Sequence, residues 1–315
     1  MMPISGNAWK RPAVITAVAA ILLALAPLVA GDYALHVLTI SLYYTILAAS
    51  WSLLAGFTGQ FSLAHQAFAA IGAYTTGLLI HYFALPIWCG IVSGVLVAGA
   101  LGFGLGRLVL RMRAIYLAIA TWAFAETIHI LLAAAYSITR GELGLSVPPL
   151  FHSLSPRPYY YVFATLTLAS VLAMYLIVRS PIGYFMRAIK DDELRAESLG
   201  VNTTRVKVFV FTVASAFAGL AGAFYAHYTV VLSPQMADFS EMAKLIIMVV
   251  VGGLGSFAGP LVGAAPVHIL TTYLAKYGEW DMVIYAVVVI VLMRLHMGGL
   301  VAIGGRIAEG IRPRR

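Results

Sequence analysis

Charged side chains are scarce in this sequence, and their scarcity excludes a water-soluble globular protein. The 315 residues include only 20 Lys and Arg and 12 Asp and Glu, so that 10% of the chain is charged while 62% is hydrophobic. An ordinary soluble domain contains about 25% charged and roughly 45–50% apolar residues. A soluble chain of this length would need more charges to cover its surface. The solvent for most of this polypeptide is therefore predicted to be lipid.

The motifs of catalysis and cofactor binding are also missing. Cys89 is the only cysteine, so the chain can form no internal disulfide, and it has no neighbouring ligands for a metal. The sequence has no phosphate-binding G-x-x-x-x-G-K-[ST] loop, no G-x-S-x-G or H-E-x-x-H motif and no clustered pair of intramembrane carboxylates. We therefore predict a protein that is not an enzyme and binds no cofactor or metal. A channel, a secondary transporter and the membrane half of a pump driven by another chain remain.

What the sequence does contain is a series of long apolar segments. A helix needs about 20 apolar residues to cross a hydrocarbon core about 30 Å thick. We predict an all-α, polytopic integral membrane protein, forming a single transmembrane domain over residues 1–315, with about ten hydrophobic segments. These segments are 13–30, 34–54, 62–83, 86–106, 115–137, 159–178, 206–229, 242–254, 257–275 and 280–297.

The positions of the basic residues predict the orientation. If the N-terminus is cytoplasmic and all ten segments cross, 16 of the 20 Lys and Arg residues face the cytoplasm, and Arg140, Arg157, Lys244 and Lys276 face the other side. Cytoplasmic loops carry an excess of Lys and Arg. Both termini are therefore predicted to be cytoplasmic, and the net charge of +8 gives no support to a nucleic-acid partner.

The pair of segments 242–254 and 257–275 allows two interpretations. The run Gly252-Gly253-Leu254-Gly255-Ser256 interrupts it, and the first segment is short for a relaxed crossing. Two full crossings and a broken or re-entrant element both return the chain to the same face, so the charge count does not separate them. A re-entrant element requires protein or a water-filled cavity around its exposed backbone.

The longest charged stretch, residues 179–205, lies between the sixth and seventh segments. Pro181 and Gly183 precede a predicted short helix over 183–200, and Gly200 stands where a left-handed cap would end it. Its charges are mixed and nearly balanced, which favours a protein partner over an anionic lipid surface. A solvated juxtamembrane helix is the alternative.

A few polar residues stand inside the apolar segments. Glu126 is predicted to be the only acid deep in any span, with His129 on the same helix face, and it should face the bundle interior, be paired or be protonated. The pair could line a substrate path or clamp two helices. Two glycine stretches, at 56–61 and 252–257, share the pattern G-x-x-G-x-F. This pattern suits close helix packing or a broken helix at a substrate site. From these stretches and their neighbours, the candidate path residues are Gln60, Ser62, His65, Gly252, Gly253 and Gly255.

Several long strings resemble one known family. GFTGQFSLAHQAFAAIGAY at 56–74, RAIYLAIATWAFAE at 113–126 and the region 180–264, with RAIKDDELRAESLGV, FAGLAGAFYAHY, LSPQ and MVVVGGLGSFAGPLVGA, resemble permease subunits of bacterial ABC importers for branched-chain amino acids. The resemblance covers about residues 35–300 in order. The loop 138–158 is similar to that of the larger of the two permease types in such importers.

The resemblance implies a set of partners and a role for segment 179–205. The partners are a second homologous permease, two cytoplasmic ATP-binding subunits and a periplasmic or lipoprotein substrate-binding protein. Segment 183–200 would seat in an ATP-binding subunit, although the importer pattern E-A-A-x-x-x-G is retained only as Ala196 and Gly200. The residues assigned to this coupling are Arg187, Lys190, Asp191, Asp192, Glu193, Arg195, Glu197 and Gly200.

The sequence therefore predicts a multi-pass permease subunit in the bacterial plasma (inner) membrane. It would translocate branched-chain or related small hydrophobic amino acids with energy from ATP hydrolysed on other chains. An ABC permease for urea, amides or other amino acids is an alternative. A stand-alone proton-coupled transporter using Glu126 and His129, or a channel, belongs to another class.

Overall fold

Helices make up most of the structure, as the apolar segments predict. The computed structural model describes residues 30–112, 114–151 and 155–274, together with residues 23, 25–27, 287 and 299–301. The predicted segments 13–30 and 280–297 and both termini lie largely outside the described residues. The other eight predicted segments coincide with eight helices: α2 (Asp32–Ala55), α3 (His65–Phe83), α4 (Ile87–Val109), α5 (Ala114–Ala134), α7 (Arg157–Arg179), α10 (Thr203–Thr229), α11 (Phe239–Gly252) and α12 (Gly259–Leu274).

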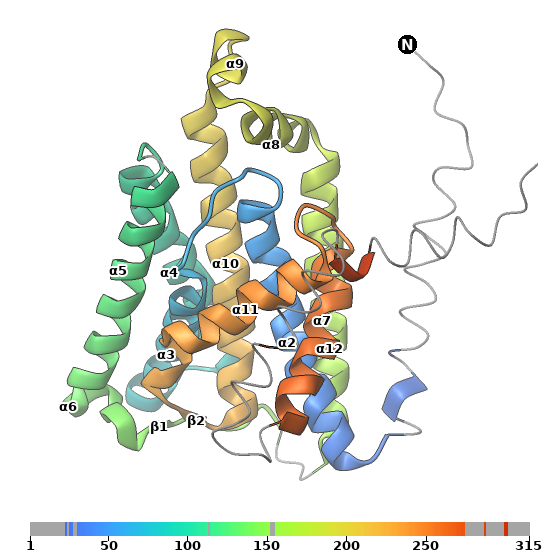
Figure 1. Cartoon of the computed structure of the whole chain (residues 1–315). Helices are drawn as coiled ribbons and strands as arrows, with labels where there is room; N and C mark the ends of the chain where they lie inside the picture. Colours follow the sequence, from blue (N-terminus) through green and yellow to red (C-terminus); the bar gives the residue numbers. More distant parts are fainter. Residues whose placement is uncertain are drawn as a thin grey trace, which may run out of the picture.

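Five of these helices, within the described ranges, are long and apolar enough to cross a membrane. They are α2, α4, α5, α7 and α10. α3 lies beside them at the centre of the bundle, packed against α4 and α10. Two short helices, α8 (Pro181–Asp191) and α9 (Glu193–Ser198), stand at one end of the bundle (Figure 1).

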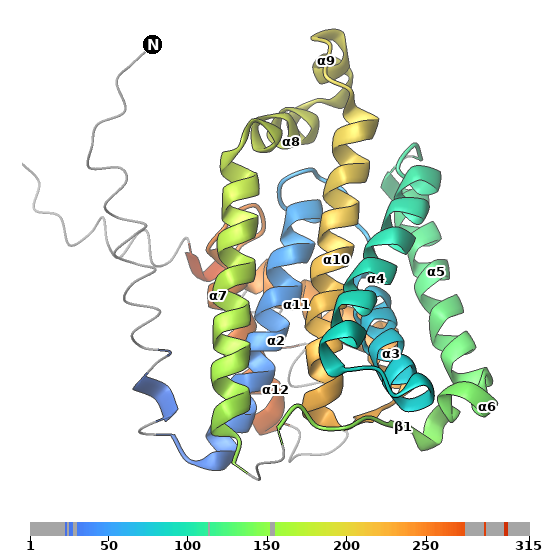
Figure 2. The same ribbon diagram turned by 180° about the vertical axis from the view of Figure 1, so that it is seen from behind.

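The opposite end of the bundle carries the short elements that follow α5 and α10. β1 (Leu145–Ser146) pairs antiparallel with β2 (Val231–Leu232), so that Leu145 lies opposite Leu232. Figure 2 shows β1 and α6 (Tyr136–Thr139) at the end away from α8 and α9. Two 3₁₀ turns, η1 (Gly141–Leu143) and η2 (Pro234–Ala237), complete this end. The predicted loop 138–158 thus fixes the segment that leads from α10 into α11.

Close backbone contacts between glycine-bearing helices hold the centre of the bundle together. α10 packs against both α3 and α4. A Cβ atom on Gly222 of α10 would collide with the backbone carbonyl of Ala69 on α3, and one on Gly72 would collide with Gly219. In lipid, where water drives no helix association, such small residues allow the dispersion contacts that hold helices together.

The segment 239–274 is a broken element rather than two long crossings. α11 has 14 residues and α12 has 16, and the chain reverses between them at Gly253 and Gly255, which have φ values of 125° and 86°. At 1.5 Å per residue, α11 is about 21 Å long, which is shorter than the hydrocarbon core of a bilayer, about 30 Å thick. α11 contacts α2, α3, α5 and α12, so protein covers much of it.

Candidate functional site

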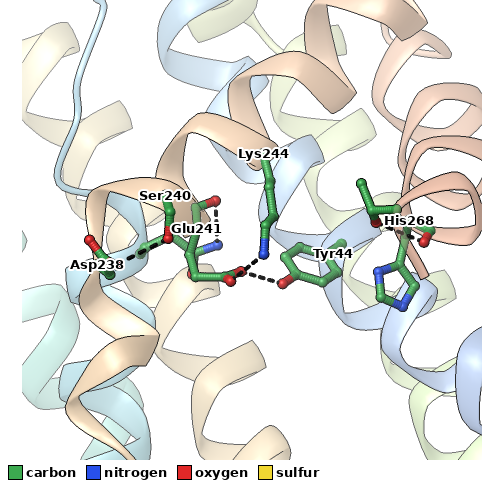
Figure 3. A network of polar contacts seen from close by, with 8 residues as sticks. Tyr44, Asp238, Ser240, Glu241, Lys244 and His268 are labelled. Carbon is green, nitrogen blue, oxygen red and sulfur yellow. Dashed lines mark hydrogen bonds and ion pairs between the residues drawn. The ribbon is translucent and has the colours of Figure 1, made fainter. Parts of the chain in front are cut away.

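A charged pair lies inside the bundle, near the start of α11 (Figure 3). The Nζ atom of Lys244 lies 2.6 Å from Oε1 of Glu241, and the Tyr44 hydroxyl donates to Oε2 of the same carboxylate at 2.5 Å. The Gln66 amide donates to the main-chain oxygen of Glu241 at 3.3 Å, and the His268 ring packs 5.2 Å from the Tyr44 ring. Side chains from α2, α3, α11 and α12 therefore gather around Glu241, whose carboxylate is held by Tyr44 and Lys244.

This polar cluster borders a cavity of about 230 Å³. Its walls come from α2, α3, α10 and the segment from β2 to the start of α11, and the rings of Tyr43 and Tyr225 stack there at 4.3 Å between centroids. Glu241 is the one Asp, Glu, Lys or Arg among the described lining residues. The lining is Tyr43, Tyr44, Gln66, Tyr225, Thr229, Val231, Ser233, Gln235, Met236 and Glu241.

The sequence prediction missed this cluster. Glu126 was expected to be the only acid deep in a span, and Lys244 was assigned to the face opposite the cytoplasm. The structure corrects the first expectation, because α11 begins at Phe239 within the bundle and carries Glu241, paired with Lys244, in its first two turns. The available signal was the spacing Glu-x-x-Lys, in which the acid at i and the base at i+3 stand directly before an apolar run.

Glu126 instead lies on a flank of this chain. Its side chain is 41% exposed, and its Oε1 lies 3.8 Å from Nδ1 of His129, beyond hydrogen-bond distance. It lines a groove of about 430 Å³ with Leu63, Ala118, Ile119, Trp122 and Phe239. The expected i, i+3 proximity to His129 is present, and of the three alternatives for Glu126 the structure gives a neighbouring partner and not a place in the interior of this chain's own bundle.

The polar residues after Gly59 are buried at the junction of α2 and α3. His65 Nε2 lies 2.7 Å from the Ser50 hydroxyl, and the Trp51 indole donates to the Ser62 main-chain oxygen at 2.8 Å. Both contacts tie α2 to the segment that leads into α3. The Gln60 side chain is 5% exposed, and its amide has no hydrogen-bond partner among the described residues.

The two glycine stretches meet beneath α8. Lys190 of α8 donates from Nζ to the main-chain oxygen of Gly56 at 2.7 Å, and a Cβ built on Gly255 would lie 3.0 Å from the same Nζ. A Cβ on Gly56 would lie 3.3 Å from the Gly255 nitrogen. Gly252 has a different position, since it packs directly against Gly259 of α12. Lys190 therefore connects α8 to both turns, a contact that the sequence did not reveal.

The predicted single helix over 183–200 is wrong, because the structure breaks it at Asp192. Asp192 has extended backbone geometry, and its side chain accepts a hydrogen bond from the Arg195 main-chain nitrogen at 3.0 Å, which caps α9. Gly200 follows α9 with φ of 86°, as the predicted left-handed cap requires. The result is two helices at an angle, α8 and α9.

Several of the charges assigned to coupling have partners within the chain. Glu193 forms an ion pair with the buried Lys207 of α10, and Glu197 accepts a hydrogen bond from Thr203. Arg187 donates to the main-chain oxygens of Val178 and Gly183.

The outer surface of α8 and α9 includes large exposed apolar side chains, namely Tyr184, Phe185 and Leu194, with Leu199 just after α9.

Comparison with known proteins identifies the family. Residues 33–293 match the family described as "Branched-chain amino acid transport system / permease component". The chain belongs to this permease family. It is 32% identical to the high-affinity branched-chain amino acid transport system permease protein LivM of Salmonella typhimurium, covering 87% of this chain and 71% of that protein. Identity to LivM of Escherichia coli is 31%, over 90% and 73% respectively.

The permease LivH of Escherichia coli is also similar, at 25% identity over 82% of this chain and 92% of that protein. No solved structure matches the chain. The expected resemblance to the larger, LivM type is thereby confirmed. Membership of the family makes this chain a multi-pass transporter permease and not an enzyme. The cluster at Glu241, the groove at Glu126 and the α8–α9 surface are therefore parts of a transport protein.

Proposed function

We propose that this chain is the LivM-type permease of a bacterial ABC importer and carries branched-chain or related small hydrophobic amino acids across the plasma (inner) membrane. The observation that carries the proposal is the match to the branched-chain amino acid permease family over residues 33–293. The permease forms one transmembrane domain, with both termini in the cytoplasm. ATP is hydrolysed on two separate cytoplasmic subunits, and a binding protein delivers the substrate.

Segment 179–205 is the coupling segment of this proposal. α8 and α9 project from the bundle end where α4 and α7 finish with Arg107 and Arg179, as a cytoplasmic face requires (Figure 1). Their exposed apolar side chains suit a groove on a protein partner. Asp191, which is exposed, lies at the rim of that contact, and the exposed Arg195 lies there in an ion pair with Asp192 at 3.5 Å, while Asp192, Glu193 and Glu197 shape the segment itself.

The flank of α5 is the proposed contact with a second, homologous permease. α5 is the least buried of the five long apolar helices. A carboxylate at the middle of such a flank would be costly against lipid, at about 2.5–3.5 kcal/mol on insertion scales if charged. Glu126 and His129 therefore face protein or a path between two permeases. Gln60 and Ser62, in the segment before α3, remain candidates for this path.

Nucleotide-dependent uptake tests the proposal. The complete importer in proteoliposomes should accumulate radiolabelled leucine, isoleucine or valine only with the binding protein outside and ATP at the ATP-binding subunits. Omission of either should abolish uptake, because the permease lacks a nucleotide site of its own. Uptake by the isolated chain without ATP, or uptake of urea in place of these amino acids, would contradict the proposal.

A further inference from the structure

The ion pair near the middle of the bundle calls for a functional explanation. Tyr44, which binds Glu241, is near the middle of α2, so the cluster lies close to the centre of the bundle's thickness. Ionisable residues at this depth are expensive to insert and usually belong to substrate or ion pathways. Glu241 and Lys244 are only partly exposed, at 25% and 36% of their side chains, and they border the cavity of about 230 Å³.

The chemistry of the cavity wall selects for one kind of solute. The carboxylate of Glu241 lines the cavity, whereas Lys244 contacts that carboxylate without being one of the described lining residues. The stacked rings of Tyr43 and Tyr225 add aromatic surface, which attracts cations. A primary ammonium group fits this wall, and an isolated carboxylate does not.

We propose that this cavity is a binding subsite for the zwitterionic head group of a free amino acid, an inference that rests on the proposed function. Glu241 receives the ammonium group in place of Lys244, and the released Lys244 then faces the carboxylate. Each charge of the solute meets an opposite charge, so that the bound state adds no unpaired charge to the membrane interior. The side chain of the solute occupies the part of the cavity beside Val231 and Met236.

The size and position of the cavity agree with this assignment. Pockets for drug-sized ligands measure about 300–1,000 Å³, so a cavity of about 230 Å³ suits a smaller solute. Val231, Ser233 and Gln235 line it from the segment after α10, and β1 holds that segment in place. The cavity therefore extends from the Glu241 cluster toward the end of the bundle opposite α8 and α9.

An exchange of the two charges separates binding from a purely structural clamp. In the complete importer, Glu241→Lys combined with Lys244→Glu keeps an ion pair but places an ammonium group in the cavity wall. We expect assembly with the partner subunits to be retained and the KM for leucine uptake to rise at least about tenfold, as loss of a charged hydrogen bond predicts. The matched control, Glu142→Gln on the exposed η1 turn, should leave KM unchanged.

A second measurement keeps Glu241 and Lys244 intact. Gln235→Cys, made with Cys89→Ser in the assembled complex, places a thiol at the exposed edge of the cavity. Leucine should slow maleimide labelling of residue 235 at least about threefold, whereas 4-methylpentanoate, which has the same skeleton without the ammonium group, should not.

The outcomes distinguish this inference from the proposed function. Wild-type KM in a charge-exchanged importer that assembles would overturn the subsite, and if that variant fails to assemble, equal labelling rates with and without leucine would overturn it. In either case ATP-dependent leucine uptake by the wild type would leave the proposed function standing. Absence of leucine uptake by the wild type would reject the proposed function instead.

Discussion

At the scale of single residues, the bundle depends on positions that have no side chain. Gly222 lies against the main chain of Ala69, and the neighbouring Gly219 lies against Ala98 of α4. α10 can therefore contact α3 and α4 at the same time. The string FAGLAGAF has the small residues that close helix packing needs, but the sequence does not reveal which helices it contacts, since that depends on the bundle as a whole.

Gly222→Leu should destabilise the permease by about 3 kcal/mol or more, because its side chain would displace the α3 backbone rather than a flexible neighbour. Thermal unfolding in detergent, followed by size-exclusion chromatography, measures the effect. Gly104→Ala on α4 is the matched control, since nothing lies within 4 Å of its added methyl group. It should leave the unfolding temperature the same or slightly higher. Equal behaviour of both variants would contradict the packing argument.

At the scale of elements, sequence predicted the apolar helices well and the polar ones less well. Lipid tolerates only a helix whose backbone bonds are all satisfied, so a long apolar run has one structural outcome. The charged stretch after α7 has more freedom. Its break at Asp192 depends on a single side chain turning back to cap α9. An Asp within the run Asp191-Asp192-Glu193 gives no sign of which acid will be the cap.

The outer surface of α8 and α9 provides the test of the coupling segment. Leu194→Asp should reduce co-purification of the ATP-binding subunits at least about tenfold, because a charge would replace an exposed apolar contact. Leu143→Asp is the control, as Leu143 is equally exposed but lies at the opposite end of the bundle. If Leu143→Asp reduces co-purification, or if Leu194→Asp leaves it unchanged, the ATP-binding subunits bind elsewhere.

At the scale of the whole molecule, the missing information concerned depth and neighbours. Counting charges treats each Lys as a residue of one face or the other, so Lys244 was assigned to a face although it is paired with Glu241 within the bundle. For Glu126 the sequence leaves three alternatives open, namely a place facing the bundle interior, a partner or protonation. A carboxylate in a span must avoid lipid, but a sequence cannot distinguish the interior of one chain from the contact between two.

Cross-linking decides which flank faces the second permease. α5 and α7 lie on opposite sides of the bundle in both views (Figures 1 and 2). In a chain carrying Cys89→Ser, Ile119→Cys beside the Glu126 groove should cross-link to cysteines placed on the partner permease, while Leu172→Cys on α7 should not. Both native side chains are more than half exposed in this chain, so the two thiols start from similar accessibility. Cross-links from residue 172 alone would move the interface to α7 and leave Glu126 without protein to shield it from lipid, against the cost that its charge imposes there.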